Sequence, residues 1–201
     1  LVQNIIDYAI IDKILIIDNA SSPKEKEQLT TLKNKLVDIY FHDENAGYSE
    51  AINIGARYAI EKYAVDSFFI SNSDIVVMSE EDLERMLAVL NQKGVGIVGP
   101  QILELGHINR GSKCPSIWMD IAQNIPLIKY VVQEQKLLYG EEHYKNETSE
   151  VEVINTCFFL ISAEVLKQVR YMDAHIFLYY EEYILARKIQ ELGLKAILCN
   201  D

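Results

Sequence analysis

The chain has 201 residues, of which 49% are hydrophobic and 24% are charged, with 19 Lys and Arg against 30 Asp and Glu. This length and composition are typical of one globular domain and exclude a disordered or fibrous chain. The formal net charge of −11 argues against binding to a nucleic-acid backbone, which needs clustered cations, so we expect no nucleic-acid partner. A phosphorylated small molecule remains compatible with this charge if a divalent metal ion lies between the two.

The compartment is indicated by cysteine usage and hydropathy. The three cysteines are an odd, widely spaced set, which favours neither a disulfide framework nor a zinc site: Cys114, Cys157 and Cys199. No apolar run approaches the ~20 residues that span a bilayer, and no signal-peptide pattern opens the chain. We therefore expect a cytoplasmic protein with no transmembrane segment, which still allows peripheral association with the inner face of the cell membrane.

Short apolar runs alternate with longer amphipathic ones through the first half of the chain. The opening residues have helical spacing, and strands are expected at 13–17, 38–42, 67–71 and 95–98. Helices are expected between them, one starting at Ser22-Pro23 and running to about Lys35, one after Ser49, and one after a capping box at Ser79. Such alternation predicts an α/β fold with a mostly parallel central sheet flanked by helices.

The alternation stops between residues 106 and 149. Residues 116–139 are compatible with one or two helices broken at Pro126, and residues 141–147 are polar and predict a solvated loop. A long strand is expected at 151–161, a short helix after Ser162, a helix from about 180 to 192, and a last strand at 195–199. The chain opens inside a helix and stops just past a strand, so we expect one domain, residues 1–201, trimmed at both ends.

Polar residues follow three of the expected strands. They are Asp18-Asn19, the stretch 43–47, and Asn72-Ser73-Asp74. Asp, Asn and Gly are ordinary turn residues at any single strand end. In open α/β sheets, however, ligands bind at the carboxyl ends of the strands, and three successive ends of this kind favour a site for a metal, a base edge or sugar hydroxyls.

Other motifs carry less weight. Residues 94–99 fit the spelling G-x-G-x-x-G, but they follow a helix and form a strand, whereas the dinucleotide fingerprint follows a strand and opens a helix. The four histidines have no ligand spacing. Tyr179-Tyr-Glu-Glu182 adds two carboxylates at a helix start, where the macrodipole favours them in any case.

Taken together, the motifs resemble the family 2 glycosyltransferases, which are inverting enzymes with the GT-A fold. Within that family, the motif sequences are most similar to those of the subgroup of rhamnosyltransferases and related bacterial surface-polysaccharide enzymes. The resemblance covers residues 13–105 and 151–200 and is carried by the stretches 14–22, 45–55, 68–77, 98–102, 155–161, 172–182 and 192–193. It implies a nucleotide-binding part at 13–105, an acceptor and catalytic part at 151–201, and a variable acceptor-side insertion at 106–149.

The resemblance assigns roles to individual residues. It implies contacts to the donor nucleotide by Asp18, Asn19, Asn45, Gly47, Asn53 and Asn72. Asp74 stands in the D-x-D-like motif, where it would ligate Mg²⁺ or Mn²⁺ on the donor diphosphate, and Asn72 replaces the first carboxylate of that motif. Glu182 holds the position of the catalytic base, which is Asp in the family; Glu181 is the alternative, because base catalysis depends on placement within hydrogen-bond reach.

The implied activity is transfer of a hexosyl or rhamnosyl unit from a nucleoside-diphosphate sugar to a saccharide or lipid-linked saccharide acceptor. A carboxylate accepts the proton of an acceptor hydroxyl, and a single displacement inverts the anomeric centre. Tyr48, Tyr179 and Tyr180 are candidates for stacking on sugar or base, and Trp118 is better explained as packing. The alternatives are a catalytically silent nucleotide-sugar-binding partner subunit and, with less support, a nucleotidyltransferase.

Overall fold

The structure is a computed structural model of the whole chain, and it describes residues 1–116 and 137–200. Trp118, Pro126 and most of the segment expected to hold one or two helices lie outside the described residues. The helices are α1 (Val2–Ile5), α2 (Pro23–Thr30), α3 (Tyr48–Lys62), α4 (Glu80–Leu90), the 3₁₀ helix η2 (Glu141–Tyr144), α6 (Ala163–Gln168) and α7 (Glu181–Glu191). The strands are β1 (Ile14–Asn19), β2 (Val37–His42), β3 (Ser67–Ser71), β4 (Val95–Pro100), β5 (Ile102–Glu104), β6 (His107–Asn109), β7 (Thr148–Val151), β8 (Phe158–Ser162) and β9 (Lys195–Cys199).

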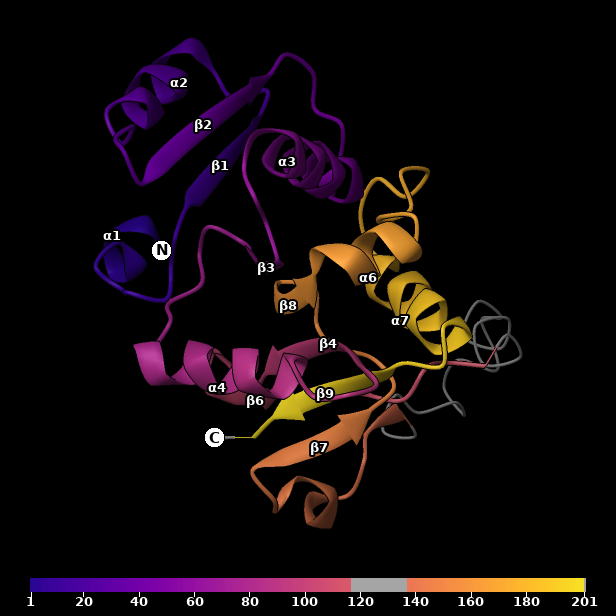
Figure 1. Cartoon of the computed structure of the whole chain (residues 1–201). Coiled ribbons are helices and arrows are strands. Elements are labelled where there is room, and N and C mark those ends of the chain that lie inside the picture. Colours follow the sequence, from indigo (N-terminus) through magenta and orange to yellow (C-terminus); the bar gives the residue numbers. More distant parts are fainter. Residues whose placement is uncertain (117–136, 201) are drawn as a thin grey trace.

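The strands form three hydrogen-bonded sets, seen in Figure 1. β1 and β2 pair in parallel, β5 and β6 make an antiparallel hairpin, and five strands form the central sheet in the order β3-β8-β4-β9-β7. Within that sheet β4 and β9 are parallel, whereas the other three pairings are antiparallel. The α/β class is confirmed, but the sheet is mixed rather than mostly parallel.

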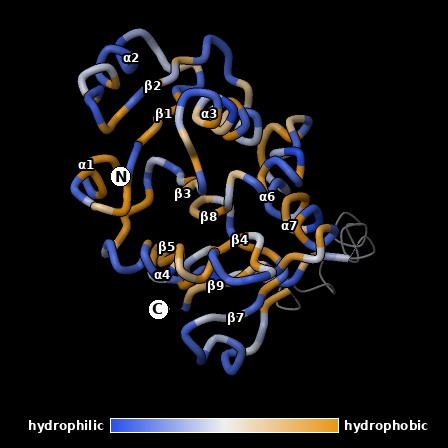
Figure 2. The backbone as a smooth tube through the Cα atoms, in the orientation of Figure 1, coloured by the Kyte–Doolittle hydropathy of each residue, from blue (hydrophilic) through white to orange (hydrophobic). Residues whose placement is uncertain are grey.

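Two hydrophobic cores lie on opposite faces of the central sheet. Alternate residues of β8 point to opposite faces, as a strand requires: Phe159 and Ile161 pack with α3, α6 and α7, while Phe158 and Leu160 pack with α4. In Figure 1, α3, α6 and α7 accordingly lie on one side of the sheet and α4 on the other. The apolar stretches of Figure 2 are concentrated on the strands between these layers.

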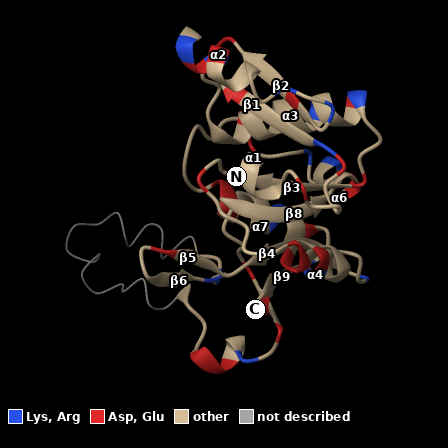
Figure 3. Cartoon of the chain, turned by 90° about the vertical axis from the view of Figure 1, so that its left-hand side faces the viewer, with Lys and Arg blue, Asp and Glu red and all other residues tan. Residues whose placement is uncertain are grey.

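The helix-start signals at Ser22, Ser79 and Ser162 are confirmed, whereas Ser49 lies inside α3, whose N-cap is Gly47. Ser22 and Glu25 form a complete capping box with Pro23 at the first turn, although α2 ends at Thr30 rather than near Lys35. Ser79 accepts a hydrogen bond from the Asp82 backbone N–H at 3.2 Å at the start of α4. Acidic residues gather on α4, as Figure 3 shows.

Two expectations for the second half of the chain are wrong. The apolar stretch 151–161 is not one strand: Val151 ends β7 and Phe158 begins β8, and the two strands pair with different neighbours. The expected loop at 141–147 contains η2, and Tyr144 is only 8% exposed because it packs in the hydrophobic core, where its hydroxyl donates to the Gly111 carbonyl at 2.8 Å. Among the described helices, none is long and apolar enough to cross a membrane.

Candidate active site at the carboxyl ends of the strands

The first candidate residue, Asp18, is buried near the end of β1 and is 3% exposed. Its Oδ2 accepts a hydrogen bond from the Ser21 backbone N–H at 3.4 Å and lies 3.8 Å from Lys26 Nζ. Its Oδ1 has no hydrogen-bond partner within the described parts of the chain. Leaving a buried acceptor unpaired costs about 1–3 kcal/mol, so this oxygen is one that a bound polar group would stabilise.

Two asparagines hold the loop that follows β2. The Asn19 side-chain amide donates to Asn45 Oδ1 at 3.0 Å and to the Gly47 carbonyl at 3.3 Å, and Asn19 Oδ1 accepts from the Ala46 backbone N–H at 2.9 Å. Asn45 Oδ1 also accepts from the Gly47 backbone N–H at 3.1 Å. Both side chains are thus bonded to protein atoms, and they fix the shape of the turn that starts α3.

The same turn contacts the segment before α7. Gly47 has φ +80°, and a Cβ atom added there would lie 2.6 Å from the Phe177 carbonyl oxygen. The Tyr48 backbone N–H donates to that carbonyl at 2.9 Å. Glycine is required here both by the left-handed backbone and by the close approach, which joins two segments about 130 residues apart in the chain.

Tyr48 lies near three candidate carboxylates, those of Asp74, Glu181 and Glu182. Its hydroxyl donates to the Thr156 carbonyl. Burial raises the pKa of Tyr48, and the nearby charges of Cys157, Glu181, Glu182 and Asp74 raise it further. The turn after β3 and the start of α7 therefore both lie near one half-buried tyrosine.

The two glutamates at the start of α7 have different surroundings. Glu181 is 8% exposed, and its Oε2 has no hydrogen-bond partner among residues 1–116 and 137–200. Glu182 is half-buried; burial raises its pKa, and the charge of Glu181 raises it further. The preceding Tyr179 and Tyr180 are exposed and adopt φ +70° and +67°, an uncommon conformation for bulky residues that is often found at functional sites.

Asn72 and Asp74 lie in the turn that follows β3. The Asn72 backbone N–H donates to the Cys157 carbonyl at 2.8 Å, which fixes this turn beside the start of β8. Asp74 is exposed, and its charge adds to burial in raising the pKa of the Cys157 thiol to about 11. Such a thiol is neutral at pH 7 and does not act as a nucleophile.

Asp74 is the candidate ligand for a divalent metal ion. Asp74 offers an exposed carboxylate, which is the hard oxygen ligand that Mg²⁺ and Mn²⁺ prefer. In the described part of the chain, no group of three His, Cys, Asp or Glu side chains could hold a metal. The residues fit an ion that keeps one or two carboxylates and takes its other ligands from substrate phosphates and water, which is the usual arrangement for Mg²⁺.

Asn53 is placed differently from the other candidates. It is 1% exposed in α3, its Oδ1 accepts from the Met172 backbone N–H at 2.9 Å, and its amide donates to the Met172 carbonyl at 3.1 Å and to Glu50 at 2.9 Å. The side chain is enclosed and hydrogen-bonded to protein on both atoms, and a contact of Asn53 with the nucleotide stays a prediction. Asn53 pins α3 to the segment before α7.

Sequence reasoning did not select Thr156 and Cys157. Their carbonyls accept from the Tyr48 hydroxyl and the Asn72 backbone N–H, so they connect the two halves of the site. Only their place in the stretch 155–161 pointed to them. A role based on backbone carbonyls leaves no signature in side-chain chemistry.

Comparison with known proteins identifies the family. Residues 2–170 match the profile described as Glycosyl transferase family 2, and the chain belongs to that family. A relative in Haloferax volcanii, "Low-salt glycan biosynthesis hexosyltransferase Agl10", is 25% identical over 172 residues, which are 85% of this chain and 50% of the relative. The chain thus spans half the length of this curated relative.

Two solved structures share the fold. A GalNAc-T7 crystal structure with UDP, GalNAc and Mn²⁺ superposes with a TM-score of 0.70 at 15% identity, over 99% of this chain and 39% of that one. The mannosyltransferase PcManGT of Pyrobaculum calidifontis, in complex with GDP-Man and Mn²⁺, superposes with a TM-score of 0.64 at 15% identity, over 98% of this chain and 50% of that one. These likenesses confirm the GT-A fold expected from the sequence.

Proposed function

We propose that this domain transfers a hexosyl unit, with rhamnosyl as the variant suggested by the sequence motifs, from a nucleoside-diphosphate sugar to a hydroxyl group of a saccharide or lipid-linked saccharide. The observation that carries the proposal is the position of Tyr48: its hydroxyl donates to the Thr156 carbonyl, the adjacent Cys157 carbonyl accepts from the Asn72 backbone N–H, and the charges of Asp74, Glu181 and Glu182 act on it. Membership of the glycosyltransferase family, a hexosyltransferase relative, and fold neighbours bound to UDP or GDP-Man support it.

The roles of the residues follow from their surroundings. The Glu182 carboxylate is the proposed base, because its pKa is raised toward the range in which a base is effective. It accepts the proton of the acceptor hydroxyl while that oxygen bonds to the anomeric carbon and the bond to the nucleoside diphosphate breaks. One displacement without a covalent intermediate inverts the anomeric configuration.

On the donor side, Asp18 and the turn held by Asn19 and Asn45 are the proposed nucleotide contacts, with Gly47 giving the turn its shape. Asn72 and Asp74 face the diphosphate in this scheme, with Asp74 as the ligand of Mg²⁺ or Mn²⁺. When bound, the metal neutralises charge on the diphosphate. The domain would act in surface-polysaccharide synthesis in the cytoplasm of a bacterium, at the inner face of the membrane where lipid-linked acceptors lie.

The test is calorimetric titration of UDP and GDP into the protein with and without Mn²⁺, followed by assay of sugar transfer. Metal-dependent binding of one nucleotide with turnover supports the proposal. Absence of nucleotide binding under both conditions would contradict it.

A silent nucleotide-sugar-binding subunit is the second candidate. It is favoured by the lack, among the described residues, of a cluster of three metal-ligating side chains. It also agrees with the replacement of the family's aspartate by Glu182. Nucleotide binding without any hydrolysis or transfer of the donor sugar would favour this candidate.

A further inference from the structure

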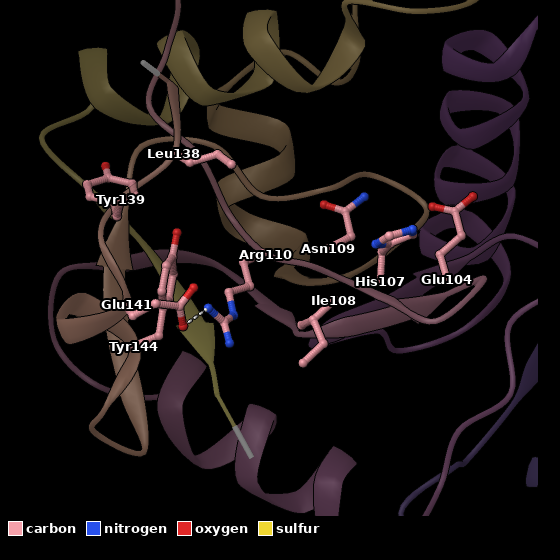
Figure 4. A pocket seen from close by; sticks show the side chains of 9 residues that line it. All are labelled: Glu104, His107, Ile108, Asn109, Arg110, Leu138, Tyr139, Glu141 and Tyr144. Carbon is pink, nitrogen blue, oxygen red and sulfur yellow. Dashed lines mark hydrogen bonds and ion pairs between the residues drawn. The ribbon is translucent and has the colours of Figure 1, made fainter. Parts of the chain in front are cut away.

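A surface hollow lies between the β5–β6 hairpin and η2. It is separate from the carboxylate cluster, which consists of Asp74, Glu181 and Glu182. It has a volume of about 320 Å³, within the range of small-molecule sites, and it is lined by Glu104, His107, Ile108, Asn109, Arg110, Leu138, Tyr139, Glu141 and Tyr144. Figure 4 shows these side chains along an elongated site, with Glu104 and His107 at one end and Tyr139, Glu141 and Tyr144 at the other. None of them has a role in the mechanism above.

The aromatic end of this hollow is ordered by ring contacts. Tyr139 stacks on His143 with ring centroids 4.1 Å apart and meets Tyr144 edge-on at 6.2 Å. The Arg110 guanidinium lies over the Tyr144 ring, 4.7 Å from its centroid. The ring faces are shared with protein groups, since Lys113 Nζ also lies 5.3 Å from the Tyr139 centroid. The ring edges beside Arg110 and Glu141 give the hollow a mixed apolar and polar lining, which suits a ligand that presents both C–H groups and hydroxyls, as a pyranose does.

The polar groups favour a neutral ligand. Arg110 Nη1 lies 2.7 Å from Glu141 Oε2, so its charge is already paired, and Glu104 adds a second carboxylate to the lining. An anionic group would meet two carboxylates against one paired guanidinium. Arg110 Nε is buried without a hydrogen-bond partner in the described part of the chain, so the protein does not saturate this guanidinium.

One end of the hollow lies closer to the proposed reaction centre than the other. The charges of both Glu104 and Asp74 act on the Cys157 thiol, and Cys157 acts on Tyr48 together with Glu181 and Glu182. Glu104 is also on β5, which begins two residues after β4 ends at Pro100, so the Glu104 end of the hollow is the end next to the carboxyl end of β4. A chain of sugars reaching from the cluster along the hairpin would bring a distal unit to Tyr139 and Tyr144.

We propose that this hollow, between the β5–β6 hairpin and η2, binds a neutral sugar unit of the acceptor, distal to the hydroxyl that is glycosylated. The inference rests on the proposed function, because it takes the ligand to be the acceptor of that reaction. It predicts that this site selects for acceptor length, so that acceptors long enough to reach Tyr139 are better substrates than monosaccharides.

The test uses neutral probes, lactose, cellobiose and mannobiose, with glucuronic acid as the anionic comparison, in saturation-transfer NMR on the protein. We expect saturation transfer to at least one neutral disaccharide, with glucuronic acid at least threefold weaker. Tyr139→Ala and Arg110→Gln should each lower the neutral signal at least fivefold. His107→Ala, at an exposed position that cannot compromise the core, should lower it as well.

Arg57→Gln is the matched control. Arg57 of α3 pairs with Glu50 at 3.1 Å and lies over the ring of Tyr171, which follows α6, at 4.9 Å; this arrangement resembles that of Arg110 but lies outside the hollow. This variant should keep the full saccharide signal. Equal loss in Arg57→Gln and Arg110→Gln, or an undiminished signal in all three hollow variants, would overturn the proposal.

Nucleotide titration on the same samples separates the two proposals. Metal-dependent nucleotide binding with no NMR saturation transfer to any neutral disaccharide leaves the proposed function standing and overturns the acceptor site. Saccharide signals that depend on Tyr139 in a protein that binds no nucleotide support the hollow as a sugar site and contradict glycosyl transfer. In a protein that does bind nucleotide, the three hollow variants should keep wild-type nucleotide affinity.

Discussion

The two glutamates that begin α7 should differ in their contribution to turnover. Glu182→Gln removes the proposed base and should lower kcat by about 10²–10⁴, while the affinity for the nucleoside diphosphate stays unchanged. Steady-state kinetics together with nucleotide titration provide the measurement. Turnover that survives Glu182→Gln but is lost in Glu181→Gln would move the base to the buried Glu181.

The pH dependence of turnover tests the same pair. A base works when deprotonated, so the rate falls as the pH drops through its pKa, and a raised pKa places that fall above the range of an ordinary glutamate. Removing the Glu181 charge takes away one cause of the raised pKa. The acidic limb of the kcat profile of Glu181→Gln should therefore move to lower pH, and a limb that does not move would show that Glu181 exerts no such influence.

The contact between the start of α3 and the segment before α7 depends on one glycine. Gly47→Ala adds a Cβ atom 2.6 Å from the Phe177 carbonyl oxygen at φ +80°, so it should lower the free energy of unfolding by about 1–3 kcal/mol and raise the KM for the donor. Chemical denaturation and donor titration measure both effects.

Gly94→Ala is the control for this substitution. Gly94 has φ +86°, but an added Cβ atom there would meet nothing within 4 Å. It isolates the cost of the left-handed backbone, about 1 kcal/mol. Equal losses of stability in the two variants would mean that the Phe177 contact contributes nothing.

Asp38 joins β2 to α3. This residue is 4% exposed; its Oδ2 accepts hydrogen bonds from Lys62 at 2.7 Å, Tyr63 at 2.6 Å and Tyr58 at 3.1 Å. The hydrogen bonds of Lys62 and Tyr63 hold the pKa of Asp38 well below its ordinary value. Asp38→Asn should reduce the free energy of unfolding by roughly 1–3 kcal/mol at pH 7.

The contribution of Asp38 to the free energy of unfolding depends on pH, because protonation and unfolding are linked. A lowered folded-state pKa contributes stability above the unfolded pKa of about 3.9, and this contribution is lost as the pH falls below it. The difference between wild type and Asp38→Asn in urea denaturation should therefore narrow between pH 5 and pH 3. Asp82→Asn, which removes an exposed pair with Arg85, should change stability by less than about 1 kcal/mol at either pH.

Helices and strands whose signals lie within neighbouring residues could be predicted from the sequence, whereas the pairing of strands that are distant in the sequence could not. Residues 67–71 are the predicted strand, and Ser22 caps its helix as expected, because both signals are contained in neighbouring residues. The break between β7 and β8 and the antiparallel pairings depend on β9 and β3, which lie far away in the sequence. No spacing within residues 151–161 encodes those partners.

The candidate site shows the same division. The polar residues after β1, β2 and β3 were selected from the sequence because ligands of open α/β sheets bind at the carboxyl ends of strands, although β1 and β2 form a sheet separate from that of β3. The enclosure of Asn53 by Met172 and the seam between Gly47 and Phe177 were not, because both partners sit in an irregular segment more than 100 residues away. The hollow at Tyr139 depends on η2, where the sequence indicated only a polar loop.

The net charge of −11 should govern how the donor binds. Asp74 is the proposed ligand of the metal at the diphosphate, and the charges of Asp74, Glu181 and Glu182 all act on Tyr48. Without a divalent metal, these carboxylates repel a diphosphate, and salt screens such repulsion with a Debye length of about 10 Å at 0.1 M and about 3 Å at 1 M.

We therefore expect the metal-free affinity for UDP or GDP to rise between 0.05 M and 0.5 M KCl, while uridine and guanosine show no such change. With saturating Mn²⁺ the trend should weaken or reverse, because the ion offsets the carboxylate charge. Calorimetric titration at both salt concentrations measures each case, and a metal-free affinity that falls steeply with salt would instead indicate a cationic diphosphate site.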